Sequence, residues 1–146
     1  MIDAADLIDD EVLVYQLLTR DVAAQDEITG ITVAASIDVD ERQPLALPHV
    51  SFTCSGTGQA GNGPGLWDTA LTVSTLAIGM DAAKALARLT YRIVHGWSDP
   101  DTSRVAGIGG VLDVTDIAKP SRQPAATIAA GVLVQYDAIY GLQLLT

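Results

Sequence analysis

The chain has 146 residues, of which 49% are hydrophobic, and its 18 acidic and 8 basic side chains give a formal net charge of −10. This length and apolar content exclude a disordered chain and predict a single domain over residues 1–146 with its own core. So large a surplus of acids excludes tight binding to a nucleic-acid backbone, because such binding depends on Lys and Arg displacing counterions.

The cysteine content and the hydropathy pattern exclude further classes. The single cysteine, Cys54, allows neither an internal disulfide nor a thiolate zinc site, and we expect it to be a small core residue. No apolar run reaches the ~20 residues of a membrane span, and the acidic start lacks the basic residues of a signal peptide. We therefore expect no membrane partner and synthesis in the cytosol.

The first predicted element is a helix over residues 3–24, with Asp3 as its N-cap and acids in its early turns, where the helix dipole favours them. Its apolar face carries Leu7, Val14, Leu18 and Val22. A half-buried strand is predicted over residues 31–39, where apolar side chains alternate. Residues 1–42 hold 11 acids against 2 bases, a net charge of −9. This charge suits either solubility or a surface past which DNA moves without binding.

A glycine-rich stretch follows the next predicted strand, residues 49–54 ("HVSFTC"). Its first glycines spell GxGxxG, which in dinucleotide-binding proteins joins a strand to a helix. The continuation "GNGPG" disfavours a helix, and residues 66–78 ("LWDTALTVSTLAI") predict another strand. We therefore expect a hairpin loop between antiparallel strands, mobile in the free protein and able to contact a partner. The glycines of this loop are Gly56, Gly58, Gly61, Gly63 and Gly65.

A second helix is predicted over residues 81–94, with Asp81 as its N-cap, Gly96 as a left-handed C-cap and Trp97 packed back on the last turn. Its inward face carries Leu86, Leu89 and Ile93. Away from that face, at i, i+4 and i+8, lies a basic stripe of Lys84, Arg88 and Arg92. Such a stripe can be a solvated face. In so acidic a chain it is also a candidate subunit interface, meeting the acidic surface of a neighbouring copy in a head-to-tail contact that can close a ring.

The chain ends in two predicted strands, residues 111–119 and 126–142, separated by Pro120 and Pro124. The predicted order is α-β-β-β-α-β-β. Short links between successive strands favour a mostly antiparallel sheet, with the two helices packed on one face. The predicted fold class is therefore α+β.

Catalysis needs convergent polar groups, and the sequence offers few of them. His49 and His95 are the only histidines, and the spacing pairs neither with a serine or cysteine nucleophile. His95 is placed at the end of a helix, where an imidazole suits the dipole. We therefore predict no catalytic residue, no cofactor and no enzymatic activity.

Two acidic groups invite a test for metal binding. Asp99, Asp101 and Ser103 imitate the start of a calcium loop, but Arg104 and Gly110 stand where that loop needs glycine and glutamate. The second group, on one face of the first predicted strand, is Asp38 and Asp40. We interpret both groups as solvated surface and predict no metal site.

Taken end to end, the chain resembles the tail-terminator proteins of long-tailed bacteriophages with non-contractile tails. The resemblance spans nearly all residues and rests on their layout. It comprises the acidic first helix, the strand "LPHVSF", the glycine loop leading into "LWDTALTVSTLAIG", the helix "DAAKALARLTYRIV" and the closing strands.

The resemblance implies a small α+β protein that forms a hexameric ring on the last ring of a tail tube. Such a ring stops tube growth and joins the head, so the implied partners are further copies of the chain, the tail-tube protein and the head–tail connector protein. The implied location is the virion tail, assembled in the host cytoplasm. A head–tail adaptor or a tail-tube subunit remains an alternative, and a small nucleotide-binding enzyme is a third hypothesis that rests only on the GxGxxG string.

Overall fold

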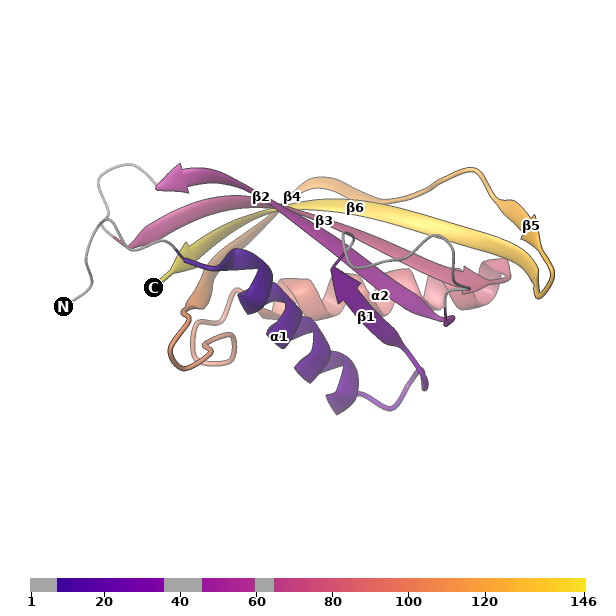
Figure 1. The fold of residues 1–146 in the computed structure, drawn as a ribbon, viewed down its shortest axis with the longest axis horizontal. Helices are drawn as coiled ribbons and strands as arrows, with labels where there is room; N and C mark the ends of the chain where they lie inside the picture. The colour runs from indigo at the N-terminus through magenta and orange to yellow at the C-terminus, as the bar shows by residue number, and fades with distance from the viewer. Residues whose placement is uncertain (1–7, 36–45, 60–64) are drawn as a thin grey trace.

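The computed structural model describes residues 8–35, 46–59 and 65–146 (Figure 1). In chain order the elements are α1 (Asp10–Ala24), β1 (Thr32–Ala35), β2 (His49–Gln59), β3 (Leu66–Ile78), α2 (Met80–Gly96), β4 (Gly110–Arg122), β5 (Ala126–Ile128) and β6 (Gly131–Leu145). The predicted α+β class and element order are confirmed. The last predicted strand, residues 126–142, is divided into the short strand β5 and the long strand β6 by a turn at residues 129–130.

The sheet has the strand order β1-β2-β3-β6-β4, and β5 pairs with the start of β6. The β1–β2 pair is parallel, whereas the other pairs are antiparallel. The central pair joins β3 to β6 from Leu66↔Leu145 to Ile78↔Leu133, along the whole of β3. The last strand of the chain therefore lies inside the sheet, between β3 and β4.

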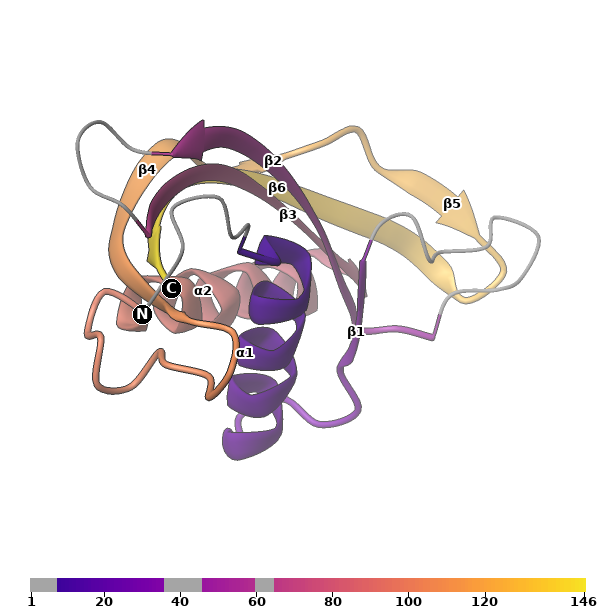
Figure 2. The same ribbon diagram turned by 60° about the vertical axis from the view of Figure 1, so that its left-hand side comes forward.

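Both helices lie on one face of the sheet, and β2, β3 and β4 arch over them (Figure 2). Because strand side chains alternate between faces, every second residue of β3 and β6 points toward the helices. Fully or almost fully buried in this layer are Leu13, Val14, Leu17, Leu18, Val50, Phe52, Leu71, Leu86, Val94, Tyr140, Leu142 and Leu144. This layer is the core, and the opposite face of the sheet carries no helix in the described structure.

Helix α1 starts later than the sequence predicts. It begins at Asp10, and the Asp9 carboxylate accepts a hydrogen bond from the Val12 amide at 3.1 Å. Asp9 therefore caps the helix, and the prediction of Asp3 as the cap is wrong; Asp3 lies outside the described residues. Several acids precede the apolar stripe, and the one adjacent to the packed turns takes the cap.

The predicted caps of α2 also need correction. Gly79, with φ of +86°, is the N-cap, and Asp81 lies within the first turn. The chain turns directly from β3 into α2 at this point, and glycine adopts a positive φ with no steric cost. At the other end Gly96 is the last helical residue, and Trp97 is the C-cap with right-handed geometry (φ −74°).

Burial of Trp97 explains this helix end. The indole is 1% exposed, and its Nε1 donates a hydrogen bond to the Asp21 carboxylate at 2.7 Å. The ring is thereby fixed between the end of α2 and the side of α1. A left-handed turn at Gly96 is not used, because the chain stays right-handed to place Trp97 there.

The glycine-rich stretch joins two antiparallel strands, as predicted, but the strand before it is longer than expected. Gly56 and Gly58 belong to β2, where they pair with Thr69 and Asp68 on either side of a bulge. The glycine that leads into β3 is Gly65, with φ of +81°. Gly61 and Gly63 lie outside the described residues. A strand, not a helix, follows the glycines, so the geometry of a dinucleotide-binding turn is absent here.

Candidate interaction surface

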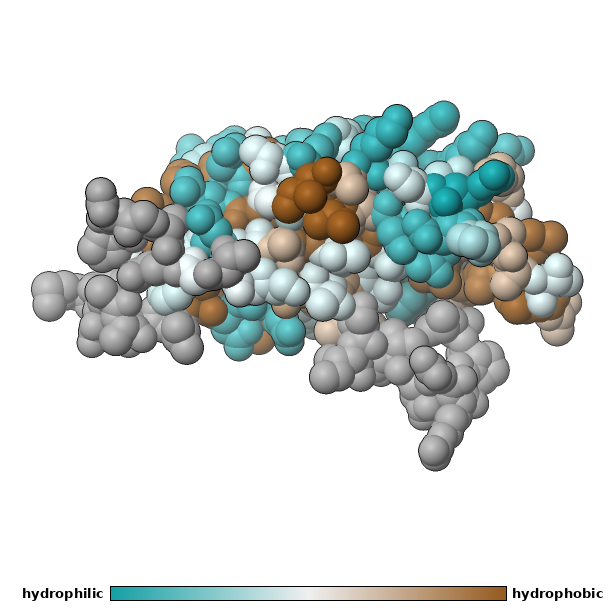
Figure 3. All heavy atoms as spheres, turned by 90° about the horizontal axis from the view of Figure 1, so that it is seen from above, coloured by the Kyte–Doolittle hydropathy of each residue, from teal (hydrophilic) through white to brown (hydrophobic). Residues whose placement is uncertain are grey.

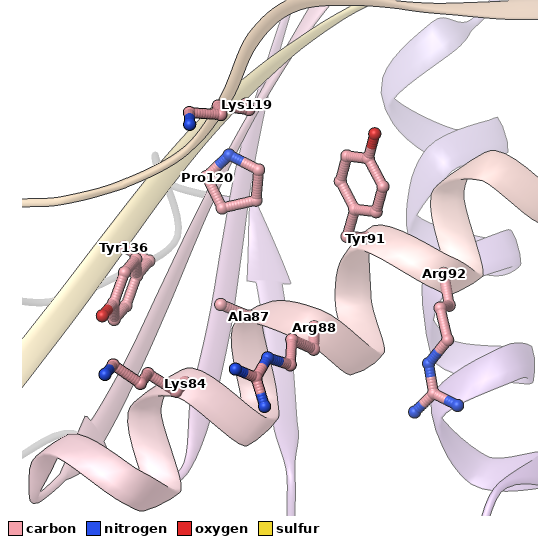
Figure 4. Close-up of a pocket in the computed structure, with 8 residues that line it drawn as sticks. All are labelled: Lys84, Ala87, Arg88, Tyr91, Arg92, Lys119, Pro120 and Tyr136. Carbon is pink, nitrogen blue, oxygen red and sulfur yellow. The ribbon is translucent and has the colours of Figure 1, made fainter.

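A hollow lies between the outer side of α2 and strands β4 and β6 (Figure 4). It has a volume of about 650 Å³. Its lining, which we call the basic cavity, is Lys84, Ala87, Arg88, Tyr91, Arg92, Lys119, Pro120 and Tyr136. Four of the eight basic residues of the chain therefore meet at one place. The floor between them is apolar and aromatic.

The predicted basic stripe of α2 forms one wall of this cavity, and Lys119 of β4 adds a fourth cation. Sequence reasoning missed Lys119, since it assigned the residue only to a strand. The ladder between β4 and β6 is irregular around it, with register shifts between Asp116 and Ala118 and between Ala118 and Ser121. Such bulges re-aim side chains and leave no clear signal in the sequence.

The four basic residues of the cavity differ in whether they form an ion pair within the chain. Arg92 donates to the Glu27 carboxylate of the same chain at 2.6 Å. This hydrogen bond lowers the pKa of Glu27 and raises the pKa of Arg92. Within the described residues, no ion pair involves Lys84, Arg88 or Lys119. The stripe is thus divided between one internally paired arginine and two cations whose charge remains available.

A hydrogen-bonded cluster fixes the aromatic end of the cavity. The Tyr91 hydroxyl donates to Asp116 Oδ2 at 2.6 Å, and His95 Nε2 lies 2.7 Å from Asp116 Oδ1. The Tyr91 and His95 rings also pack against each other, with centroids 4.4 Å apart and planes tilted by 46°. The hydrogen bonds from Tyr91 and His95 lower the pKa of Asp116, and the bond to Asp116 raises the pKa of Tyr91. The sequence did not reveal this pairing, because 21 residues separate His95 from Asp116.

The contacts of the cluster hold the Tyr91 side chain in place. The hydrogen bonds of the cluster end at the Tyr91 hydroxyl, and no serine or cysteine joins them within the part of the chain that the structure describes. Cys54 lies elsewhere, on β2, where burial and nearby Asp10 raise the pKa of its thiol to about 12. A thiol of that kind is a poor nucleophile at neutral pH.

The second histidine is built into the β1–β2 edge of the sheet. His49 is 4% exposed, and its Nδ1 lies 2.6 Å from the Thr32 hydroxyl. Its Nε2 has no hydrogen-bond partner among the described residues. Burial lowers the pKa of His49. The observed contacts make it part of the packing between two parallel strands.

Within the described residues, no three His, Cys, Asp or Glu side chains come together in a way that could hold a metal ion. Asp99 accepts a hydrogen bond from the Asp101 amide at 3.1 Å, which closes a local turn. Ser103 is fully buried and bonds to the backbone of Val111. Asp38 and Asp40 lie outside the described residues. In residues 8–35, 46–59 and 65–146, no helix is long and apolar enough to span a membrane.

The start of α1 presents a surface of the opposite charge to the basic cavity. Its exposed acids are Asp9 and Glu11. Beside them Val12 and Tyr15 are 39% and 45% exposed. We call Asp9, Glu11, Val12 and Tyr15 the acidic α1 surface. It borders a groove of about 410 Å³ that continues over β1.

The face of the sheet that carries no helix is mixed, with hydrophilic residues around a hydrophobic cluster near its centre (Figure 3). Strand pairing assigns to this open face three carboxylates, those of Asp68, Asp113 and Asp137. Serine, threonine and glutamine fill many of the positions between them, and no Lys or Arg occupies a paired position of this face in the described strands. A shallow groove of about 310 Å³ crosses the face at Gly141, where a Cβ atom would approach the Thr115 hydroxyl to 2.8 Å.

No protein-family model matches the sequence, and no curated protein matches it. Among solved structures, the fold is similar to that of a chain in the virion of a native gene transfer agent particle. The TM-score is 0.59, and the match covers 94% of this chain and 95% of that chain at 16% sequence identity. The similarity therefore extends over the whole fold, including both helices and the sheet.

Proposed function

We propose that this chain is a structural protein of a phage-like virion, and that it forms a ring on the end of a tail tube. The ring stops tube growth and presents a surface to the head connector. The observation that carries the proposal is the fold shared with a virion chain over 94% and 95% of the two lengths. Because the match covers nearly all of both chains, the shared fold is that of the whole chain and not of one part of it.

The open face of the sheet supports the same function. In a ring, one face of each subunit lines the channel through which DNA passes. The open face carries the carboxylates of Asp68, Asp113 and Asp137 and has no Lys or Arg at its paired positions. Such a lining has no cations there to displace counterions from DNA phosphates, so DNA passes without binding. We assign the open face to the channel, and the helix-covered face and its edges to contacts between proteins.

Catalysis forms no part of the proposal. The one carboxylate–imidazole pair of the described structure, Asp116 with His95, is used to hold Tyr91. An assay with nucleotides tests the remaining alternative, because a ligand at about 100 times its Kd adds about 2.7 kcal/mol to the free energy of unfolding. We expect no nucleotide to shift the melting temperature.

Electron microscopy of the purified protein, alone and mixed with growing tail tubes, tests the proposal. We expect six-fold rings or ring-capped tubes whose length no longer increases. Rings that bind tube ends without stopping growth would favour an adaptor. Incorporation along the tube wall would identify a tube subunit instead.

A further inference from the structure

We propose that the basic cavity is the receiving half of a head-to-tail contact, and that its occupant is the acidic α1 surface of a second copy of this chain. The inference rests on the proposed ring and names the contact that closes it. It begins with the chemistry of the cavity. The cations Lys84, Arg88 and Lys119 have no ion pair within the described residues, and they surround a floor formed by Ala87, Pro120 and two tyrosines. Such a site fits an occupant that combines carboxylates with apolar side chains.

Five large apolar side chains are exposed in the described structure, and they narrow the choice of occupant. Ile128 and Val132 lie on the β5–β6 hairpin, where residues 125–133 contain no acid. Ile117 lies beside Gly141, in the groove of the open face. The remaining two, Val12 and Tyr15, share the first turns of α1 with exposed Asp9 and Glu11. Among residues 8–35, 46–59 and 65–146, only the acidic α1 surface therefore joins both kinds of side chain outside the open face.

The fold prevents α1 from filling the cavity of its own chain. The start of α1 is tied to the sheet, since the Thr69 hydroxyl donates to Asp10 Oδ2 at 2.9 Å. The other end of α1 is the part that meets α2, through the hydrogen bond from Trp97 to Asp21. Just beyond α1, Glu27 holds Arg92 at the corresponding end of the basic cavity. The donor and receiving surfaces are thus different parts of one rigid layer, and a contact between them joins two copies.

A contact between two different surfaces repeats in one rotational sense and can close into a ring. Each ion pair in it is exposed and individually weak, so stable assembly requires repetition around the ring together with burial of Val12 and Tyr15. Raising the ionic strength weakens such pairs by screening. We therefore expect the fraction of assembled protein to fall as salt increases.

Charge reversal tests the pairing directly. Arg88→Glu and Glu11→Arg are each expected to abolish assembly at low salt, alone or on tube ends. Both monomers should stay folded, although Glu11→Arg should lower the melting temperature slightly, because it places a cation in the first turn of α1. In an even-numbered ring, an equimolar mixture of the two variants can alternate so that every contact joins opposite charges. We expect that mixture to assemble again, and we expect the double variant to assemble by itself. Sedimentation velocity measures the assembled fraction in every case.

The control for Arg88→Glu is Arg104→Glu, which makes the same change of charge at an exposed residue outside the cavity. Assembly of the single variants at the wild-type level would overturn the inference and leave the ring intact as a function. The inference also fails if the mixture does not recover, or if Arg104→Glu disrupts assembly equally. If Ile128→Asp abolishes assembly and Glu11→Arg does not, the occupant of the basic cavity is the β5–β6 hairpin of the second copy and not its acidic α1 surface. A wild-type protein that forms no ring, alone or on tubes, would contradict the proposed function itself.

Discussion

Leu71 and Thr72 are neighbours in β3 but lie on opposite faces of the sheet. Leu71 is fully buried beneath the helices, and its cross-strand partner Tyr140 is 1% exposed. Thr72 lies on the open face, paired with Ile139 and Thr53, and is only partly buried. The same strands thus build a core on one side and a more exposed surface on the other. Fewer side chains of the open face are fully buried, so packing constrains its composition less.

The largest effect on stability is expected on the covered face. Leu71→Ala removes fully buried methyl groups and leaves a cavity, so it should lower the free energy of unfolding by about 2–5 kcal/mol. The matched variant Thr72→Ala should change it by about 0.5 kcal/mol or less. Urea unfolding followed by circular dichroism measures both. Equal losses would show that the two faces do not differ in the way described.

The next effect concerns the attachment of the helices to each other. Asp21→Ala removes the acceptor of the Trp97 indole N–H and should cost about 1–2 kcal/mol, because a largely buried donor is left without a partner. Asp26→Ala is the control, since Asp26 is an exposed acid close to the end of the same helix. Chemical denaturation of the two variants gives the comparison. A cost for Asp26→Ala as large as that for Asp21→Ala would mean that only net charge matters.

A smaller, pH-dependent effect is expected at His49, where the edge of the sheet is buried. Burial lowers the pKa of His49 below the ordinary value of 6.5, so the unfolded chain takes up its proton first as the pH falls. The stability contributed by neutral His49 is complete above about pH 6.5 and declines below it until the folded state also protonates. Free energies of unfolding for wild type and His49→Gln between pH 8 and pH 5 should diverge in that window. If the free energies of the two proteins change in parallel with pH, buried neutral His49 makes no pH-dependent contribution to stability.

The smallest effect on stability, with a large effect on binding, is expected on the open face. Thr72→Lys combined with Ser74→Lys should cost about 1 kcal/mol or less, because sheet propensity differences span about that range. The variant should nevertheless bind double-stranded DNA in a salt-dependent way, since it adds cations to a face that has none at its paired positions. The double glutamine variant is the control for size. If the lysine variant binds DNA no better than the glutamine variant, the open face does not line the channel.

The sequence predicted the elements that depend on local pattern. Alternating apolar and β-branched residues gave β3 its observed bounds, Leu66–Ile78, and the apolar positions of α2 included the buried Leu86 and Leu89. The wrong predictions concern the ends of the helices, which depend on packing as well as on local sequence. Several acids could cap α1, and the helix starts directly after Asp9, where Asp10 accepts a hydrogen bond from Thr69 of the sheet. Gly96 could end α2, but the buried Trp97 does so instead.

The candidate interaction surface was predictable only in part. Helical spacing places Lys84, Arg88 and Arg92 on one side of α2. Lys119 joins them through bulges in β4, and Glu27 takes Arg92 through a contact across 65 residues. Asp116 likewise reaches His95 and Tyr91 only in the folded chain. Cross-strand bulges and distant contacts have no short-range signature, so the cavity emerges only from the fold.

The length of the tail is the most direct test of the proposed function. The gene for this chain would be removed from an assembling phage-like particle, and tail lengths would be measured by electron microscopy, with the gene restored as control. We predict tubes of uncontrolled length that fail to join heads. Tails of normal length that lack only heads, or the absence of any tube, would contradict the claim that this chain caps tube growth.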